Sequence, residues 1–267
     1  MWINEIFSCT KPVIAMVHLD AFPGTVRYDA EGGLEKICEH AAQDYNALCE
    51  GGVSGVIFCN ENDKPYTMHA GPEIAATMTA VVNYVLNQAP KKIPFGIDIQ
   101  WDPKAALAVA KATGAAFIRG IVCGTFCGDL GFFTPNPLEI AAYRKQIGAE
   151  HIKILTNLAP EFSCTLDTRD ICVRAQTAVK SSPVDGLCVS GVMAGGDAPF
   201  EQLQRVKAAV ANMDIPVFAN TGVKPENAKD ILSIADGCVT ATCLKVEMIS
   251  TNRIDVNNVR AFMDRLN

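Results

Sequence analysis

The sequence predicts one (β/α)8 barrel, a TIM barrel of the α/β class, as a single domain over residues 1–267. Eight short apolar runs alternate with stretches of helical periodicity, the pattern of parallel strands joined by helical crossovers. The length of 267 residues is near the roughly 250 typical of this fold. The chain is 49% apolar and 19% charged, enough to bury a parallel sheet. No linker or shift in composition divides it.

Eight apolar runs are the predicted strands. They are continuous rather than alternating, as expected of strands that are buried on both faces. In chain order they are VIAMVHL from Val13, GVIFCN from Gly55, FGIDIQ from Phe95, AFIRGIV from Ala116, HIKILTN from His151, GLCVSG from Gly186, PVFANTG from Pro216 and GCVTAT from Gly237.

Helix boundaries are predicted between these runs. Gly71, Asp102 and Lys224 each precede a proline, which is favoured in the first turn of a helix, and Gly114 is placed to end a helix before the fourth strand. Every strand-to-helix junction then lies on one face of the barrel. Barrel enzymes place their chemistry on that face.

Charge and hydropathy exclude several classes of function. The formal net charge is -6 and we find no Lys/Arg cluster, so nucleic acid is not an expected partner. No apolar run approaches the roughly 20 residues that span a bilayer, and the amino terminus carries no basic segment followed by an apolar one. We therefore expect a cytoplasmic protein without membrane contact.

The eleven cysteines do not predict a disulfide framework. Their number is odd, and Cys59, Cys188 and Cys238 lie inside apolar runs, as buried small hydrophobic residues do. Cys123 and Cys127 form a CxxxC pair after the fourth strand, but no histidine or second pair follows at the spacing of a zinc site.

Two connections are longer than usual and are candidate lids. They are HLDAFPGTVRYDAEGG after the first strand and CGTFCGDLGFFTPN after the fourth. Phe132 and Phe133 in the second connection either shield a ligand from water or pack at the end of the barrel or in a homo-oligomer interface.

The loops after the seventh and eighth strands, ANTGVKPEN and TATCLK, are candidate phosphate-binding loops. Gly222 allows the backbone to approach an anion, Asn220 and Thr221 supply polar groups, and Thr242 and Lys245 follow the last strand. The alternative is that the glycine serves only a tight turn.

The loop after the sixth strand, SGVMAGG, is the third candidate contribution to phosphate binding. Ser190 and Gly191 begin it, and Gly195 and Gly196 leave its backbone open. Together the three loops predict a small phosphorylated molecule as the partner.

Four residues near strand ends are the candidate catalytic groups. His18 is a general base or a satisfied core histidine. Lys153, inside HIKILTN, is expected to pair with Asp98 or another carboxylate, or to have a lowered pKa suited to a Schiff base. Arg119, inside AFIRGIV, is expected to pair with a carboxylate or to bind a substrate anion.

A magnesium ion is a cofactor that the sequence allows, although no motif requires one. Oxygen ligands of the kind that Mg²⁺ prefers follow the second and third strands, in no diagnostic spacing. They are Asn60, Glu61, Asp63, Asp98 and Asp102.

The segments KPVIAMVHLDAFPGTVRYD, GVKPEN and ADGCVTATCLKVE resemble the BtpA family, and especially its SgcQ-like branch. The resemblance covers nearly the whole chain, and its most specific part is the first segment. The matching residues of that segment are Met16, His18, Leu19, Pro23, Gly24, Tyr28 and Asp29.

The resemblance implies a ribulose-phosphate-binding barrel and suggests which residues to examine. It matches His18, Arg119, Lys153 and Ser190 with family positions, and Asp98 with a position that is usually asparagine. Asp129 and Gly191 also match. Ala241 replaces a glycine of the usual last loop, and NLAPEFSC lacks the basic residues that many members carry there.

Three functions follow as hypotheses. The first is an enzyme of carbohydrate metabolism that acts on a sugar phosphate by acid/base proton transfer, of isomerase, epimerase or aldolase type. The second is a non-enzymatic assembly or regulatory protein, as the photosystem I effect of relatives implies. The third is a metal-dependent nucleotide phosphohydrolase.

Overall fold

The computed structural model describes residues 1–191 and 199–266, and it confirms the eight-stranded parallel barrel. The strands close in the order β1-β11-β10-β9-β7-β4-β3-β2, and each lies within a run predicted from the sequence. The barrel strands are β1 (Val13–His18), β2 (Gly55–Cys59), β3 (Phe95–Asp98), β4 (Phe117–Gly120), β7 (Lys153–Asn157), β9 (Gly186–Val189), β10 (Val217–Ala219) and β11 (Gly237–Thr240).

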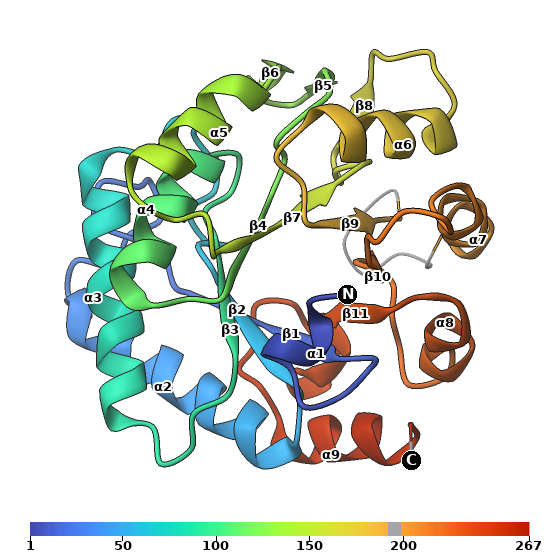
Figure 1. Cartoon of the computed structure of the whole chain (residues 1–267). Coiled ribbons are helices and arrows are strands. Elements are labelled where there is room, and N and C mark those ends of the chain that lie inside the picture. Colours follow the sequence, from blue (N-terminus) through green and yellow to red (C-terminus); the bar gives the residue numbers. More distant parts are fainter. Residues whose placement is uncertain (192–198, 267) are drawn as a thin grey trace.

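Helices follow the strands along the chain and surround the barrel (Figure 1). They are α2 (Gly33–Gly51), α3 (Pro72–Gln88), α4 (Pro103–Thr113), α5 (Pro137–Gln146), α6 (Ile171–Ser181), α7 (Phe200–Ala209), α8 (Ala228–Ile234) and α9 (Val256–Asp264). In the described ranges, no helix combines the length and the apolar character needed to cross a membrane.

The helix boundaries follow the local signals of the sequence. Asp102 caps α4 by accepting hydrogen bonds from the backbone N–H groups of Lys104 (3.1 Å) and Ala105 (3.0 Å). Gly114 ends this helix with a φ of 77°, a left-handed conformation that favours glycine. Helix α8 begins later than the Lys224-Pro225 signal, because Asn227 precedes its first residue and accepts a hydrogen bond from the Lys224 N–H (2.8 Å).

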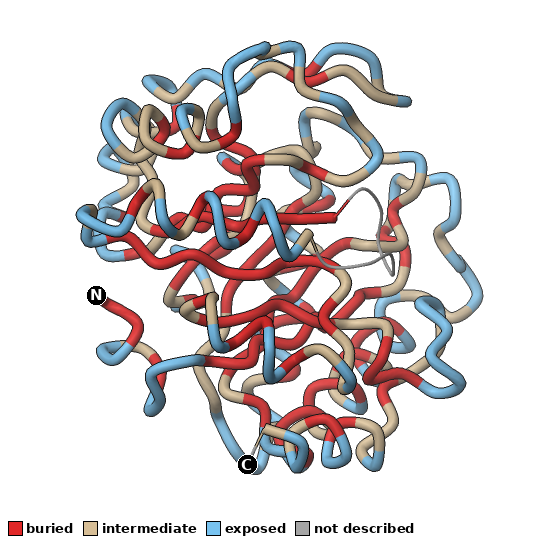
Figure 2. The backbone as a smooth tube through the Cα atoms, turned by 90° about the vertical axis from the view of Figure 1, so that its right-hand side faces the viewer, coloured by how far each residue is buried: buried red, intermediate tan, exposed pale blue. Residues whose placement is uncertain are grey.

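The two larger parts of the core lie outside and inside the barrel. The larger part lies between the strands and the helices, and Figure 2 shows these buried strands as the centre of the molecule. The smaller part fills the barrel and is closed at the amino ends of the strands by α1 (Ile3–Ile6). There Trp2 stacks on Phe218 and donates a hydrogen bond to the carbonyl of Asp185 (2.6 Å). This end of the barrel is therefore a packed apolar plug.

A small antiparallel sheet, which the sequence did not predict, lies in the connections at the other end of the barrel. Its strands are β5 (Phe126–Gly128), β6 (Gly131–Phe133) and β8 (Ser163–Thr165), in the order β6-β5-β8. The first two follow β4 and the third follows β7, so two distant connections are joined here. Three-residue strands carry too little periodicity to be recognised in a sequence.

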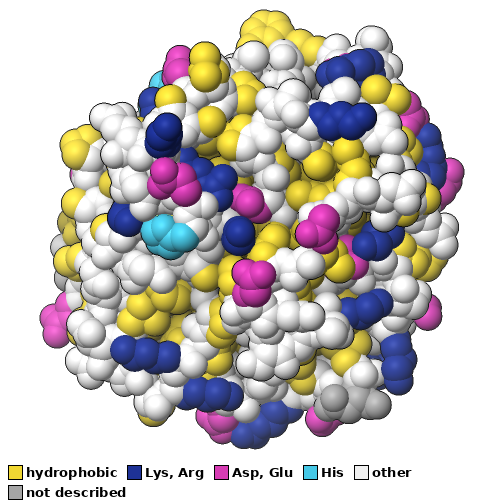
Figure 3. Space-filling model, in the orientation of Figure 1, with side chains coloured by type: hydrophobic (Ala, Val, Ile, Leu, Met, Phe, Trp, Pro, Cys, Tyr) yellow, Lys and Arg dark blue, Asp and Glu magenta, His cyan; other side chains and the backbone are white. Residues whose placement is uncertain are grey.

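Charged side chains are mixed on the face of the molecule that Figure 3 shows. Lysine and arginine alternate with aspartate and glutamate there, and no continuous basic patch covers this face (Figure 3). Several of the basic and acidic side chains on the surface form exposed ion pairs, such as Arg260–Glu50 (2.5 Å).

Candidate functional site at the carboxyl end of the barrel

The inside of the barrel changes from apolar to polar along the strands. Side chains alternate between the two faces of a strand, so residues two apart point the same way. His18 follows the interior residue Met16, and Arg119 follows Phe117 in the same way. Asp98, Asn157 and Asn220 stand at the corresponding positions of β3, β7 and just after β10, and all three are buried. The polar groups therefore form one layer at the carboxyl ends.

Arg119 is the centre of this layer. Its Nε and Nη2 atoms donate to Oδ2 of Asp98 (2.9 and 2.5 Å), and its Nη1 donates to Oδ1 of Asn220 on the other side of the barrel (2.8 Å). Burial lowers the pKa of Arg119, but the carboxylates of Asp98 and Glu161 raise it above its ordinary value, so the guanidinium stays charged. The predicted pairing of Arg119 with a carboxylate is confirmed.

Glu161 is a member of the site that the sequence did not reveal. It lies between β7 and β8, and its carboxylate accepts hydrogen bonds from the amide groups of Asn220 (3.3 Å) and Asn157 (3.2 Å) and from the hydroxyl of Thr221. Ser190 is in the same network, because its hydroxyl donates to Oδ1 of Asn157 (3.0 Å) and accepts from Asn220 (2.8 Å). Side chains predicted to hold a phosphate hold a carboxylate of the chain itself.

The backbone of the two late loops offers further donors. Asn220 is engaged, since its N–H donates to the carbonyl of Val189 (3.0 Å). The N–H groups of Thr221, Gly222 and Thr242 have no acceptor among the described residues. Gly222 has a φ of 75°, a conformation that only glycine adopts readily. These three amides are thus not engaged by the described chain.

The other residues noted in the three candidate loops have different outcomes. Ala241 packs against the apolar cluster inside the barrel, so its methyl group belongs to that core. Gly191 is buried beside Ser190. Gly195 and Gly196, which were also expected to contribute, lie outside the described residues.

His18 is buried at the carboxyl end of β1. Its Nδ1 atom has no hydrogen-bond partner in the described part of the chain. The pKa of His18 is lowered to about 4, chiefly by burial; the carboxylate of Glu61 opposes this shift, and the charges of Lys245 and Arg119 add to it. The imidazole is therefore neutral at pH 7, which leaves one ring nitrogen able to accept a proton and the other able to donate one.

Lys153 does not lie in this layer, and its predicted pairing with Asp98 is wrong. Strand β7 begins at Lys153, whose register partner is Phe117, while Asn157 at the other end of the strand contacts Ser190. Four residues of a strand span about 13 Å, so Lys153 lies near the amino end of the barrel. Arg119 is the partner of Asp98 instead.

Lys245, in contrast, is a buried lysine at the carboxyl end. It is only 1% exposed, and its Nζ donates to the carbonyl of Asn252 (3.0 Å). Burial lowers the pKa of Lys245 to about 8, although Asp44 opposes this effect. The segment that follows Lys245 folds back over it, because Lys245 and Ile254 form an antiparallel β-bridge. Lys245 is therefore a buried lysine whose pKa is lowered.

Several of the predicted magnesium ligands have structural roles. Asp63 accepts hydrogen bonds from the Phe22 N–H (2.7 Å) and the Asn60 side chain (2.8 Å), and Asp102 caps α4. Glu61 pairs with Lys64 (2.6 Å). Within residues 1–191 and 199–266, no three histidine, cysteine or acidic side chains gather as metal ligands.

The small sheet contributes aromatic side chains near the site. Phe133 is buried and packs edge-on against Trp101 with ring centroids 5.1 Å apart, whereas Phe132 is 71% exposed. Phe133 thus packs at the end of the barrel, which is one of the alternatives predicted for these two phenylalanines. A hollow of about 440 Å³ borders the sheet between Gly124 and Arg169.

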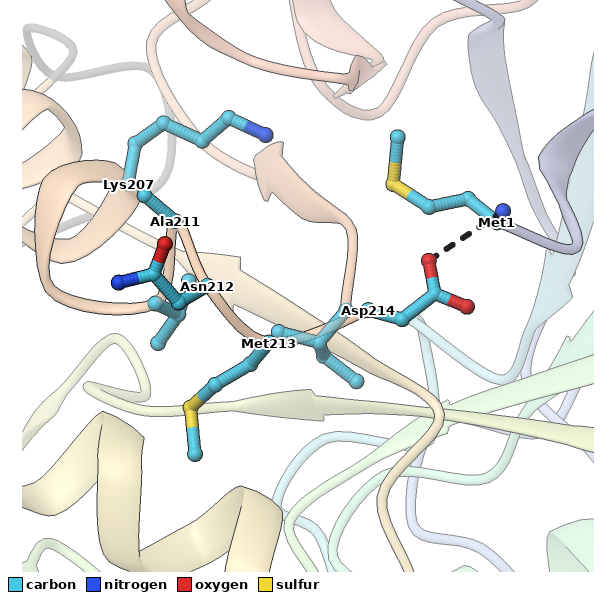
Figure 4. A pocket seen from close by; sticks show the side chains of 8 residues that line it. Met1, Lys207, Ala211, Asn212, Met213 and Asp214 are labelled. Atoms are coloured by element: carbon cyan, nitrogen blue, oxygen red, sulfur yellow. Dashed lines mark ion pairs between the residues drawn. The ribbon is translucent and has the colours of Figure 1, made fainter.

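A second hollow lies at the opposite end of the molecule. It has a volume of about 350 Å³ and is lined by residues that precede β10, among them Lys207 and Asp214, and by Met1 (Figure 4). The terminal ammonium of Met1 pairs with Asp214 there (3.3 Å). It contains none of the polar layer described above.

Comparison with known proteins shows the family of the chain. The family model for the BtpA family matches residues 9–267. The chain belongs to the BtpA family. It is 41% identical to the sgc region protein SgcQ of Escherichia coli K12, over 99% of this chain and 97% of that protein. It is 29% identical to the photosystem I biogenesis protein BtpA of Synechocystis, over 100% of this chain and 91% of that protein.

Among solved structures, the fold is similar to that of thiamine phosphate pyrophosphorylase from Pyrococcus furiosus. The TM-score is 0.54 at 16% identity, and the alignment covers 96% of this chain and 95% of that one. At this identity the similarity establishes the TIM-barrel fold.

Proposed function

We propose that the chain is an enzyme of carbohydrate metabolism that acts on a small sugar phosphate by acid/base proton transfer, with an isomerase, epimerase or aldolase-type outcome. The observation that carries the proposal is the arrangement at the carboxyl end of the barrel. Backbone N–H groups of Thr221, Gly222 and Thr242 without acceptors among the described residues follow the last two strands, and the Arg119 guanidinium lies in the same layer as Asn220. Donors at these loops suit a phosphate.

Glu161 determines how a phosphate would enter. A carboxylate already accepts hydrogen bonds from Asn220 and Thr221, so these donors stabilise an anion in the absence of substrate. A second anion beside it would be repelled. Entry of the phosphate therefore requires Glu161 to move away or to become protonated, and the substrate takes over its hydrogen bonds.

His18 and Arg119 supply the chemistry in this proposal. Neutral imidazole can accept a proton from a carbon next to a carbonyl group and return it elsewhere. Arg119 would stabilise the negative charge that develops on the enolate oxygen, and it is held ready for this by Asp98. Asp98 is then a positioning residue, because its carboxylate is occupied by Arg119. Lys153 has no part, because it lies at the other end of its strand.

One relative is the sgc region protein SgcQ of Escherichia coli, and a solved structure of the same fold is named for a phosphorylated metabolite, thiamine phosphate. The second similarity supports a phosphorylated substrate. Neither name specifies a sugar, so the substrate within this class is open to direct screening.

Titration calorimetry with a panel of sugar phosphates, inorganic phosphate and nucleotides tests the proposal. We expect at least one sugar phosphate to bind and the variant Gly222→Ala to lose at least tenfold in affinity, because a side chain is strained at this φ. Gly52→Ala is the matched control, since Gly52 has a φ of 90° and lies at the end of α2. Absence of binding to every sugar phosphate would refute the proposal.

A non-enzymatic role is the second candidate, because one relative is named for photosystem I biogenesis. In that case the polar layer would only hold the barrel end together. An affinity purification from the native cell, followed by His18→Ala and Arg119→Met variants, tests it. A stable protein partner whose binding survives both changes, together with no sugar-phosphate binding, would favour this role.

A further inference from the structure

Two cysteines face each other in the small sheet at the carboxyl end of the barrel. Strands β5 and β8 are antiparallel, and their register places Cys127 directly opposite Cys164. The N–H of Leu166 donates to the carbonyl of Thr125 (2.9 Å), so the pair two residues further along the ladder is also a hydrogen-bonded pair. Such pairs have Cα atoms about 5.5 Å apart, inside the range of about 4.4–6.8 Å that disulfides occupy.

The two thiol side chains project from the same face of this sheet. Opposite residues of an antiparallel pair share a face, and successive residues alternate. Phe126 and Phe133 are buried in one cluster with Ile121 and Trp101, called here the aromatic cluster. Phe132, the partner of Cys127 on β6, is instead 71% exposed. Cys127 therefore points outward, and Cys164 is exposed. A small reagent can reach this pair from solvent.

Cys123 and three cysteines of the barrel strands lack these properties. Cys123, which shares the CxxxC motif with Cys127, is partly buried, and burial raises the pKa of its thiol. Burial also raises the pKa of the Cys59, Cys188 and Cys238 thiols, which lie inside the barrel wall. Raised pKa values leave little reactive thiolate at neutral pH. The strand register therefore sets Cys127 beside Cys164.

We propose that Cys127 and Cys164 form a reversible intramolecular disulfide by exchange with a small-molecule disulfide such as oxidised glutathione. The thiolate of one cysteine, most accessibly Cys164, attacks the small disulfide and releases one small thiol. The second cysteine then attacks the mixed disulfide, forms the Cys127–Cys164 bond and releases a second small thiol. The two cysteines lose two electrons and two protons, which reduce the reagent to two thiols.

The bond would tie together the two connections that flank the site. β5 carries Phe126 of the aromatic cluster, and β8 begins two residues after Glu161. Their backbones are already close, because a Cβ on Gly128 would meet the carbonyl of Phe162 at 2.5 Å. Oxidation therefore restricts the segment that carries Glu161 without altering the barrel. This effect is separate from the proposed enzyme activity and can be tested without a substrate.

Peptide mapping of the full chain after exposure to oxidised glutathione tests the proposal. Trypsin releases Cys164 as the single cysteine of peptide 154–169 and releases Cys123 with Cys127 in peptide 120–144. The Cys123→Ser variant makes the assignment unambiguous. We expect the two peptides to be recovered joined, and to separate on reduction. The melting temperature of the oxidised chain should rise by about 5 °C, because a loop of this length loses freedom in the unfolded state.

Matched variants sharpen the result. Cys127→Ser and Cys164→Ser should each abolish the joined peptide, and Cys9→Ser, which changes an exposed cysteine elsewhere, should leave it intact. If Cys127 and Cys164 are recovered singly, alkylated or glutathionylated, under conditions in which Cys9 reacts, the proposal is overturned. Recovery of Cys164 joined to Cys9 or to another chain would overturn it as well.

Discussion

The two ends of the barrel are built from the same strands and differ in what fills them. At the amino end, Trp2, Phe7, Phe117 and Phe218 pack against one another, and α1 covers them. At the carboxyl end, the next inward positions carry a histidine and, joined by hydrogen bonds across the barrel, aspartate, arginine and asparagine. The interior is a hydrophobic core at one end and a polar network at the other.

This difference indicates which end serves function. Apolar packing stabilises a fold with no need for matched partners, whereas buried charges carry a desolvation penalty that their pairing only partly offsets. A chain that required only stability could continue the apolar layer to the carboxyl end. We therefore propose the end that carries the buried Arg119–Asp98 pair, the neutral His18 and the carboxylate of Glu161 as the functional end, and variants at the two ends should behave differently.

Arg119→Met should give the largest effect. It leaves the buried carboxylate of Asp98 without its partner, and removing one member of such a pair costs about 3–5 kcal/mol. Urea denaturation measures this change in the free energy of unfolding. Arg260→Met is the control, because its exposed pair with Glu50 should contribute less than about 1 kcal/mol. Equal effects of the two substitutions would mean that the network is not buried as described.

The stability of the protein should fall as the pH falls from 6.5 towards 4, and His18 should account for about 3 kcal/mol of this fall. The pKa of His18 is about 4 in the folded state against 6.5 in the unfolded chain, so the unfolded state binds more protons in this window. His18→Gln should flatten the profile relative to the native chain, whereas His151→Gln, at an exposed position, should not. If both variants keep the pH dependence of stability of the native chain, His18 is not a buried neutral imidazole.

Glu161→Gln should raise the affinity for inorganic phosphate about tenfold, which corresponds to roughly 1.4 kcal/mol. The substitution keeps a side chain able to hydrogen-bond but removes the charge that competes with the anion. Calorimetry measures it, and Glu5→Gln, in α1 at the other end of the barrel, is the control for net charge. Weaker binding in Glu161→Gln would instead make this carboxylate part of the recognition of substrate.

Lys153→Met should give the smallest effect. Because this lysine lies near the amino end, both phosphate affinity and the free energy of unfolding should stay within about 0.5 kcal/mol of the native values. Denaturation and calorimetry on the same preparation check both. A tenfold loss of phosphate affinity would return Lys153 to the site.

The barrel itself could be predicted from the sequence, because eight apolar runs and their helix caps are local signals. Asp98 and Arg119 were found for the same reason, since each is a charged residue in an otherwise apolar strand. Lys153 met this criterion too, but the run HIKILTN did not show that the strand begins only at the lysine. A charged residue in an apolar strand can therefore lie at either end of the barrel.

Other features depended on contacts between distant parts of the chain. Glu161 reaches Asn220 and Thr221 from about sixty positions earlier, and Lys245 is buried by a segment that also contacts Asp44 on α2. No local pattern marks either residue. The small sheet and its opposed cysteines likewise arise only when the connections after β4 and β7 meet. These features required the structure.

Backbone amide shifts, recorded by NMR during titration with inorganic phosphate, test the central claim most directly. If the anion enters the two late loops, the largest changes will be at Thr221, Gly222 and Thr242, and the amides of α1 at the other end will not move. Saturable changes confined to other surfaces, with these three amides unaffected, would contradict the assignment of this end of the barrel as a phosphate site.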